Sequence, residues 1–268
     1  MTQAPSKDGV RTLPGVYKPS SHQKQSFGIC IYGRGGVGKT TLIGTMPGKG
    51  LVIDVPQIEG GTFVLEDHAD RIDIVPVNTW NDINEIYWYL AKEKHSYQWV
   101  AVDSITAMTE LAKRKTLTER DLSMDAYVIS LQEWGKVGRL VGELIYKFRV
   151  LPVHTIWVAQ QRSFGGASDE VGGEGMSGPD VSPSALQALL PSMLLVGKLS
   201  VEPAMDGSYE RHLRIGPNDR CYTKCRAKPG VDVPAVIRNP NLNGILRYIL
   251  GHSTERPEEV DEDVIIIG

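Results

Sequence analysis

The sequence predicts an α/β fold built around a largely parallel sheet. Three observations lead to this prediction: short apolar, β-branched runs alternate with longer amphipathic stretches, a glycine-rich turn joins the first run to the first helix, and a later run ends in an acid. The composition is that of a water-soluble globular protein with one substantial core, because 41% of the 268 residues are hydrophobic and 23% are charged.

Strands are expected where short runs have the apolar, β-branched content of strands buried on both faces. These runs are 27–32, 51–55, 72–77, 98–103 and 154–159. Amphipathic stretches predict helices over 39–46, 80–94, 104–117 and 124–148. Beyond a glycine-rich stretch at 163–183, antiparallel strands are expected over 193–201, 209–215 and 221–227, with a hairpin turn at Asp206-Gly207.

The two ends of the chain differ in composition from its middle. Residues 1–25 mix proline, glycine, serine and lysine with almost no apolar periodicity, which predicts a flexible arm and a candidate contact between subunits. Residues 252–268 hold six acids and one arginine and close on an apolar tip, which predicts a solvated acidic tail. The core is therefore expected to span residues 26–251.

Charge and cysteine content exclude several classes of protein. Lysines and arginines number 29 against 32 acids, a net charge of −3, so the chain as a whole is no polycation and any nucleic-acid contact is expected to be local. No apolar run approaches the roughly 20 residues of a membrane span, and residues 1–25 lack the apolar core of a signal peptide, so we expect a cytoplasmic protein without membrane contact. The three cysteines lack zinc-site spacing and are expected to be reduced thiols.

The strongest motif is GRGGVGKT at residues 33–40, which fits the phosphate-loop pattern G-x-x-x-x-G-K-[ST] between an apolar strand and a helix. Its glycines let backbone N–H groups surround phosphate oxygens, and the start of the helix adds the positive end of its dipole. We expect Lys39 to reach the β- and γ-phosphates of ATP, and Thr40 to offer its hydroxyl to Mg²⁺. The expected nucleotide-binding residues are Gly33, Arg34, Gly35, Gly36, Val37, Gly38, Lys39, Thr40 and Thr41.

A second metal-site element is the apolar run that ends in Asp103. In a phosphate-loop protein such a strand is expected beside the first strand, where its terminal carboxylate binds Mg²⁺ through water. Asp103 is therefore predicted to complete the metal site with Thr40.

Four segments, in their order along the chain, resemble the RecA-like recombinase core. They are GRGGVGKT, VIDVPQIEGGT, WVAVDSIT, and VAQQRS with the glycine-rich loop that follows it. The likeness covers about residues 25–250. It is greatest to the small phage RecA-like proteins of single-strand annealing and recombination systems, the Sak-type AAA-domain nucleotide-binding proteins.

This resemblance implies a RecA-like P-loop ATPase core that binds single-stranded DNA and promotes strand annealing or exchange in phage homologous recombination. It implies ATP hydrolysis stimulated by single-stranded DNA, in the host bacterial cytoplasm, by a ring or filament of identical subunits with ATP between them. It also allows a single-strand-binding protein, or another replication or recombination partner, to bind the acidic tail.

The same resemblance assigns roles near the nucleotide. Glu59 matches the acid that positions the attacking water, with Asp54 or a plain loop acid as alternatives. Gln161 matches the polar residue that senses the γ-phosphate, and it is only slightly favoured over Gln160.

Two DNA-binding loops are implied as well. The second loop follows Arg162, which can pair with phosphate, and Phe164 offers a face for a base. Because residues 163–183 carry acids and no lysine or arginine, a plain surface loop is the alternative there. The first loop follows the helix 104–117, and its candidate contacts, for which a solvated helix face is the alternative, are Lys113, Arg114, Lys115 and Arg120.

Lys224 and Arg226 would lie on one face of a strand, because strand side chains alternate with a period of two. In the RecA-like family a basic pair at this place reaches the nucleotide of the neighbouring subunit and stabilises charge on its γ-phosphate. The alternative is an ordinary basic strand face.

Two rival functions stay open. GGVGKTT and the segment after Asp54 are also similar to the ParA-like partitioning ATPases, although the run ending in Asp103 lacks their proline pair. The other rival is a nucleotide-gated module that binds DNA or a partner protein with little hydrolysis. A measured ATP turnover separates these rivals.

Overall fold

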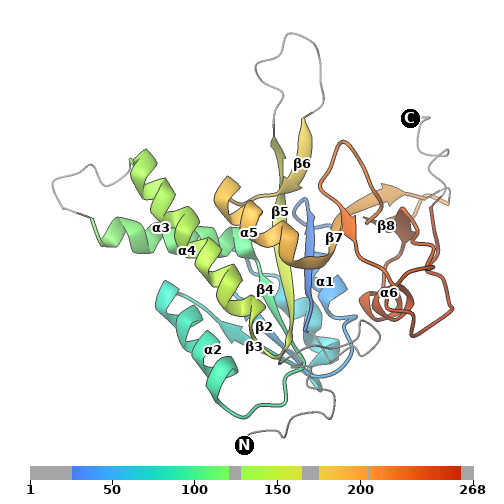
Figure 1. Cartoon of the computed structure of the whole chain (residues 1–268), viewed down its shortest axis with the longest axis horizontal. Helices are drawn as coiled ribbons and strands as arrows, with labels where there is room; N and C mark the ends of the chain where they lie inside the picture. The colour runs from blue at the N-terminus through green and yellow to red at the C-terminus, as the bar shows by residue number, and fades with distance from the viewer. Residues whose placement is uncertain (1–25, 121–127, 165–174, 205, 261–268) are drawn as a thin grey trace, which may run out of the picture.

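The computed structural model describes residues 26–120, 128–164, 175–204 and 206–260. These residues confirm the predicted α/β fold with a mostly parallel central sheet (Figure 1). Ten strands among them form one sheet in the order β10-β8-β7-β1-β5-β4-β2-β3, with β6 paired to β5 and β9 paired to β7. The predicted arm at residues 1–25 lies outside the described part of the chain.

The parallel part of the sheet contains β1 (Gly28–Gly33), β2 (Gly50–Asp54), β3 (Ile72–Pro76), β4 (Trp99–Asp103), β5 (His154–Phe164) and β7 (Met193–Pro203). Antiparallel pairing adds β6 (Met176–Pro179), β8 (Tyr209–Arg214), β9 (Lys224–Cys225) and β10 (Val236–Arg238). The first five expected strands are confirmed within a few residues, but β5 continues well past its expected end, to Phe164.

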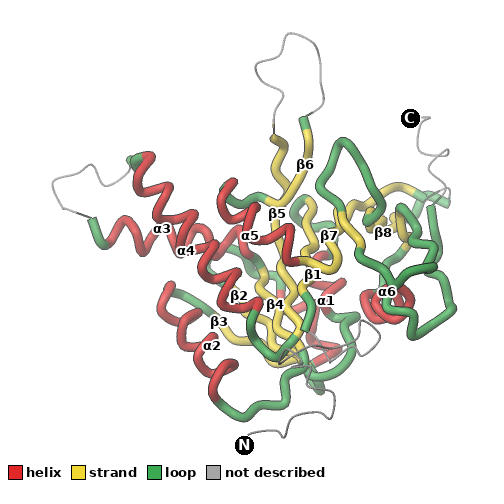
Figure 2. Tube along the Cα trace, in the orientation of Figure 1, coloured by secondary structure: helices red, strands yellow, loops and turns green. Residues whose placement is uncertain are grey.

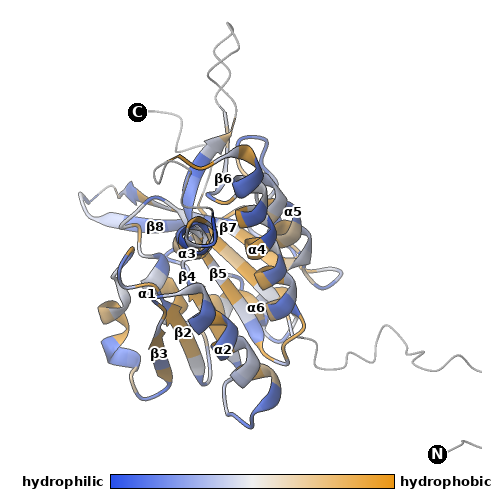
Figure 3. Ribbon diagram, turned by 90° about the vertical axis from the view of Figure 1, so that its left-hand side faces the viewer, coloured by the Kyte–Doolittle hydropathy of each residue, from blue (hydrophilic) through white to orange (hydrophobic). Residues whose placement is uncertain are grey.

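Helices cover both faces of this sheet (Figure 2). One face packs against α2 (Trp80–Lys92), α3 (Ile105–Thr118), α4 (Leu131–Arg149) and α5 (Pro183–Ser192). The other face packs against α1 (Lys39–Ile43), the 3₁₀ helix η1 (Thr62–His68) and α6 (Leu242–Ile249). Apolar strands therefore lie between two helical layers, as the hydropathy colours of Figure 3 show.

The strand that ends in Asp103 does not lie beside the first strand, which corrects the expectation from the sequence. Strand β5 pairs in parallel with β1 on one side and with β4 on the other. The chain leaves β4 through α3 and α4 before it returns as β5, and this crossover inserts β5 between the two motif strands. The end of β5 therefore lies between the phosphate loop and Asp103.

The later part of the chain holds two further corrections. Strand β9 has only two residues of the expected run 221–227, because the preceding residues bond to β6 instead: the Tyr222 N–H donates to the Ser177 carbonyl at 2.9 Å. Residues 252–260 are mostly exposed, as expected, but they do not extend freely from the core, since the Val260 N–H donates to the Val236 carbonyl at 2.9 Å and Arg238 pairs with Glu258 at 3.2 Å. Residues 261–268 of the expected tail lie outside the described chain.

All three cysteines are free thiols, as predicted. In the described ranges, no helix has the length and apolar character that crossing a membrane would require.

Two glycine substitutions test the packing of the sheet. A β-carbon on Gly50 would lie 2.0 Å from the fully buried indole of Trp99, whereas one on Gly135, on the exposed face of α4, meets nothing within 4 Å. We expect Gly50→Ala to lower the free energy of unfolding by about 1–3 kcal/mol through overpacking. Gly135→Ala should raise it by about 0.5–1 kcal/mol through helix propensity.

Urea unfolding followed by circular dichroism measures both changes. Equal transition midpoints for the two variants would contradict the packing described around Trp99.

Candidate active site

The phosphate loop joins β1 to α1 at the carboxyl edge of the sheet (Figure 1). Gly36 has a φ of 79° and Gly38 a φ of 93°, backbone conformations in which a side chain would be strained. Gly38 is also the N-cap of α1, so the loop turns its backbone toward the positive end of the helix. This local geometry is what phosphate binding requires.

Lys39 is held inside the loop, with only 7% of its surface exposed. Its Nζ donates to the carbonyl oxygens of Gly33 at 3.0 Å and Arg34 at 2.8 Å, and to Oε1 of Gln160 at 3.2 Å. Burial lowers the pKa of Lys39, while the nearby charges of Glu59 and Asp103 act in the opposite direction. The ammonium is therefore fixed at the point where the motif places the β- and γ-phosphates.

Thr40 and Asp103 meet as predicted for a metal site. The Thr40 hydroxyl donates to Oδ2 of Asp103 at 2.7 Å, and Asp103 is 8% exposed. Burial raises the pKa of Asp103 to about 6, and the charges of Glu59 and Asp54 add to this effect. Asp54 lies opposite Asp103 in the β2–β4 register and accepts a hydrogen bond from the Thr62 hydroxyl at 3.1 Å.

The residues present fit a magnesium ion whose ligands come partly from the protein and partly from the phosphates of a bound nucleotide. Among the described residues, no group of three or more histidines, cysteines, aspartates and glutamates is arranged to hold a metal by itself. Mg²⁺ commonly binds proteins through one or two side-chain oxygens together with substrate phosphates. Thr40 and Asp103 supply such oxygens next to the phosphate loop.

Glu59 connects to the phosphate loop through one side chain. Nε2 of Gln160 donates to Oε1 of Glu59 at 2.7 Å, while Oε1 of the same amide accepts from Lys39. Gln160, and not the favoured Gln161, therefore lies between the loop lysine and the predicted base. The β1–β5 register decides between them, because it pairs Gln160 with Gly33 and turns the next side chain to the other face.

Two residues that the sequence analysis missed support this edge. The Thr106 hydroxyl accepts from the Gln160 N–H at 3.0 Å and donates to the Asp180 carbonyl at 3.0 Å, so it fixes the end of β5. Nε of Arg211, on β8, donates to the Val37 carbonyl at 3.2 Å. No local pattern marks Arg211, because β8 approaches the phosphate loop only through its pairing with β7.

The other predicted loop residues differ in exposure. Arg34, Gly35 and Thr41 are exposed, whereas Val37 packs partly against the core below α1.

The cations predicted for the first DNA loop are engaged within the chain. Each of three has an acidic partner: Lys113 with Glu110 at 3.5 Å, Lys115 with Glu119 at 2.8 Å, and Arg120 with Glu133 at 3.2 Å. Arg114 donates to Oε1 of Gln57 at 3.2 Å. The contacts of Lys113, Arg114 and Lys115 are those of a solvated helix face, whereas the Arg120–Glu133 pair lies beyond the end of α3 and has only 8% of each side chain exposed.

Arg162 and Phe164 lie on one face of β5. The Arg162 guanidinium is 5.5 Å from the centre of the Phe164 ring and 3.9 Å from Asp180, and the ring meets Tyr222 edge-on at 6.0 Å. Phe164 is half-buried, so protein groups already cover part of the surface predicted to receive a base. Residues 165–174 of the predicted second DNA loop lie outside the described residues.

Lys224 caps a helix of its own chain. Its Nζ donates to the carbonyl oxygens of Leu190 at 2.8 Å and Pro191 at 3.0 Å, at the end of α5, and burial lowers its pKa. Arg226 is exposed. The role of this pair toward a neighbouring subunit stays a prediction.

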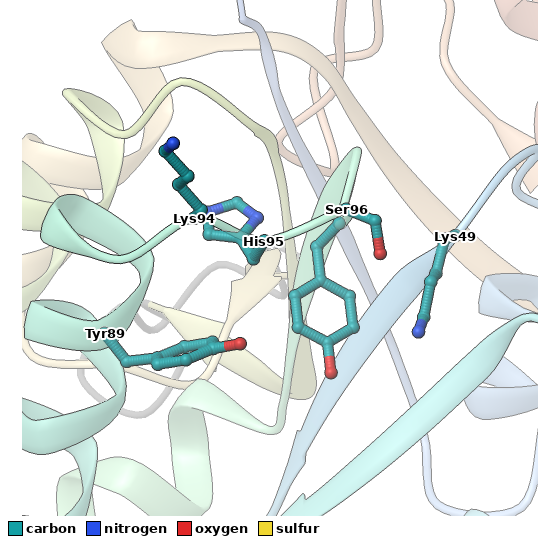
Figure 4. Close-up of a pocket in the computed structure, with 6 residues that line it drawn as sticks. Lys49, Tyr89, Lys94, His95 and Ser96 are labelled. Carbon is teal, nitrogen blue, oxygen red and sulfur yellow. The ribbon is translucent and has the colours of Figure 1, made fainter.

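A hollow of about 380 Å³ lies at the opposite edge of the sheet, beside the residues that precede β2 and β4 (Figure 4). Its lining residues are Lys49, Tyr89, Lys94, His95, Ser96 and Tyr97. Asp73 accepts from the Tyr97 hydroxyl at 2.7 Å and pairs with Lys49 at 3.2 Å. The hollow lies at the opposite end of the strands from the phosphate loop, so it is not the nucleotide site.

Comparison with known proteins identifies a family. A family model described as "AAA domain" matches residues 26–227, which include the phosphate loop, Glu59, Asp103 and Gln160. No curated protein sequence matches this chain. Among solved structures, the chain is similar to a KaiC-like protein from the hyperthermophilic archaeon Pyrococcus horikoshii OT3, with 15% identity, a TM-score of 0.40, and coverage of 71% of this chain and 78% of that chain.

The raised pKa of Asp103 predicts a pH-dependent stability of the nucleotide-free protein. Because this pKa is about 6 in the folded chain and 3.8 in the reference state, the folded chain keeps a proton that the unfolded chain releases. The contribution is fully present below about pH 4 and is lost as the pH rises to about 6, a total of about 3 kcal/mol.

Urea unfolding at intervals from pH 4 to pH 7 measures this contribution. As the pH rises, the free energy of unfolding of Asp103→Asn should increase relative to that of the wild type. For Asp70→Asn, at an exposed aspartate, the difference from the wild type should not change with pH. A parallel profile for Asp103→Asn would contradict the burial described.

Proposed function

The chain belongs to the AAA-domain family that its residues 26–227 match, and on that premise we propose that it hydrolyses ATP in response to single-stranded DNA. It is a nucleotide-binding P-loop NTPase with a RecA-like α/β core. The proposed activity is that of a recombinase, which assembles on a single strand and promotes annealing or exchange.

One observation carries the proposal of hydrolysis: the hydrogen-bonded chain from Lys39 through Gln160 to Glu59. Hydrolysis needs a carboxylate within one water of the γ-phosphate, and a lysine that stabilises negative charge there. Here one amide sets the position of both groups. A gated module without turnover has no need of a carboxylate held in this way.

Each residue then has a defined task. The backbone N–H groups of the phosphate loop bind phosphate oxygens, and Lys39 adds positive charge beside them. Glu59 orients the attacking water and accepts its proton, while Gln160 keeps the carboxylate in place. Mg²⁺, when bound, neutralises charge on the phosphates, and Thr40 and Asp103 are the residues that would hold it.

Strand β5 offers the link to DNA. Gln160 contacts the nucleotide site, and four residues later the same strand ends at Phe164, within the predicted second DNA loop that follows Arg162. The Asp180 N–H donates to the Gln160 carbonyl at 2.8 Å, so both arms of the β5–β6 hairpin are tied to this residue. A DNA strand that binds to the hairpin and moves it would thus act directly on Gln160.

Assembly into a ring or filament is part of the proposal. Arg34, Gly35 and Gly36 are exposed, which leaves the phosphate loop open to a neighbouring subunit. Phe63, on η1 close to the site, is 77% exposed, an apolar surface that a neighbour would cover.

Glu59→Gln tests the proposed base. The amide keeps the size of the side chain but accepts no proton, so we expect kcat for ATP to fall by about 100-fold or more, with nucleotide binding retained. Glu66→Gln makes the same change at an exposed acid of η1 and should leave kcat unchanged. Phosphate release by both purified variants measures the effect, and full turnover by Glu59→Gln would reject Glu59 as the base.

Gln160→Ala tests the positioning role of the amide. Loss of hydrogen bonds to two charged groups, at about 1.5–3 kcal/mol, should lower kcat by about 10- to 100-fold. Gln132→Ala, at an exposed position on α4, is the matched control and should have wild-type kcat. If Gln161→Ala reduced kcat as much as Gln160→Ala does, the assignment of Gln160 would be wrong.

A further inference from the structure

A second hollow, of about 580 Å³, lies beside the phosphate loop, where β5 presents the face opposite to Gln160. Its side chains come from the phosphate loop, β5, β6, β7 and the segment after β8: Arg34, Gln161, Ser163, Ser177, Lys198 and Arg220. We call it the cationic hollow, because three of these side chains are cations and none of the described residues that line it is an acid.

Regular structure places these cations. Lys198 pairs with Tyr32 in the β1–β7 register, only two residues before Arg34 in the chain. The Ser177 N–H, on β6, donates to the Arg220 carbonyl at 2.8 Å and holds that segment against the hairpin. Strands β5, β6 and β7 therefore form most of the wall of the hollow, and binding sites are usually preformed in this way.

The charge of the cationic hollow favours an anion. Arg34 and Lys198 make no side-chain hydrogen bond or ion pair with any residue in the described ranges. Lys198 is half-buried, so its charge is less screened by water than that of a surface lysine. Three cations gathered in one concave surface focus a positive potential, which an anionic ligand neutralises.

We propose that the cationic hollow binds the phosphates of a nucleic-acid strand, an inference that rests on the proposed function. Arginine, lysine, serine and glutamine are the side chains that contact phosphate and sugar, and the hollow has no aromatic side chain to select a base. The strand would be bound without regard to sequence. Arg34 lies on the loop that holds the nucleotide, so strand and nucleotide share one structural element.

Two residues with expected roles at the nucleotide would then contact the strand. Gln161, predicted to sense the γ-phosphate, contacts the strand instead, and Arg34, predicted to bind nucleotide, faces the strand through its side chain. The inference adds Lys198 and Arg220 to Arg162 as candidate phosphate contacts.

The salt dependence of binding tests the inference. Fluorescence anisotropy of a labelled oligothymidylate, with a non-hydrolysable ATP analogue and increasing NaCl, gives the slope of log K against log salt. In the double variant Lys198→Gln, Arg220→Gln the magnitude of this slope should fall by about 1.4, because each lost phosphate contact removes about 0.7 for a single strand. Lys94→Gln, at the exposed lysine of the opposite hollow (Figure 4), should keep the wild-type slope.

Further measurements make each outcome decisive. Arg220→Gln alone changes an exposed side chain, should fold even if the double variant does not, and should lower the slope by about 0.7. If the wild type binds the strand and both variants keep the wild-type slope, the assignment of the cationic hollow as the binding site is wrong and the proposed function stands. If the wild type binds no strand, the proposed function fails.

A free nucleotide is the other ligand whose phosphates could bind in the cationic hollow. Equilibrium dialysis with labelled ATP should give one nucleotide per chain in the wild type and in the variants. Two in the wild type and one in the double variant would overturn the assignment to a nucleic-acid strand.

Discussion

The side-chain amide of Gln160 is the contact on which the rest of the site depends. Its oxygen accepts from Lys39 and its nitrogen donates to Glu59, so a single planar group fixes the distance between a cation and a carboxylate. Lys39 is buried, and burial of a charge is costly unless polar partners compensate for it. The carbonyls of Gly33 and Arg34 and the Gln160 amide supply that compensation.

Strand β5 positions Gln160 for this contact. Its insertion between β1 and β4 brings Gln160 to the centre of the carboxyl edge, between the phosphate loop and Asp103. The alternation of strand side chains then directs Gln160 to the nucleotide and Gln161 to the cationic hollow. Strand β5 thus joins the sites of the two proposed ligands. A nucleotide bound on one face of β5 can act on a DNA strand bound on the other face, because β5 is a rigid element.

Much of this could be predicted from the sequence, because the motifs are local. GRGGVGKT sets its own backbone through Gly36 and Gly38, and an acid at the end of an apolar strand needs only the sheet to reach Thr40. The order of the strands could not be predicted, nor could the choice between adjacent glutamines, because both depend on the pairing of β5 with β1. Arg211 and Lys198 come to the site through strands far along the chain. Helices α5 and α6 did carry start signals, the caps Ser182 and Asn241, which the sequence analysis did not use.

The proposed function requires that ATP turnover at Lys39 responds to single-stranded DNA. The most direct test is ATP turnover by the purified wild type with and without single-stranded DNA, with Lys39→Ala as the blank. We expect single-stranded DNA to stimulate turnover and Lys39→Ala to abolish it. Turnover that is equal with and without the strand would contradict the account and favour a partitioning-type ATPase, and nucleotide binding without turnover would favour a gated module.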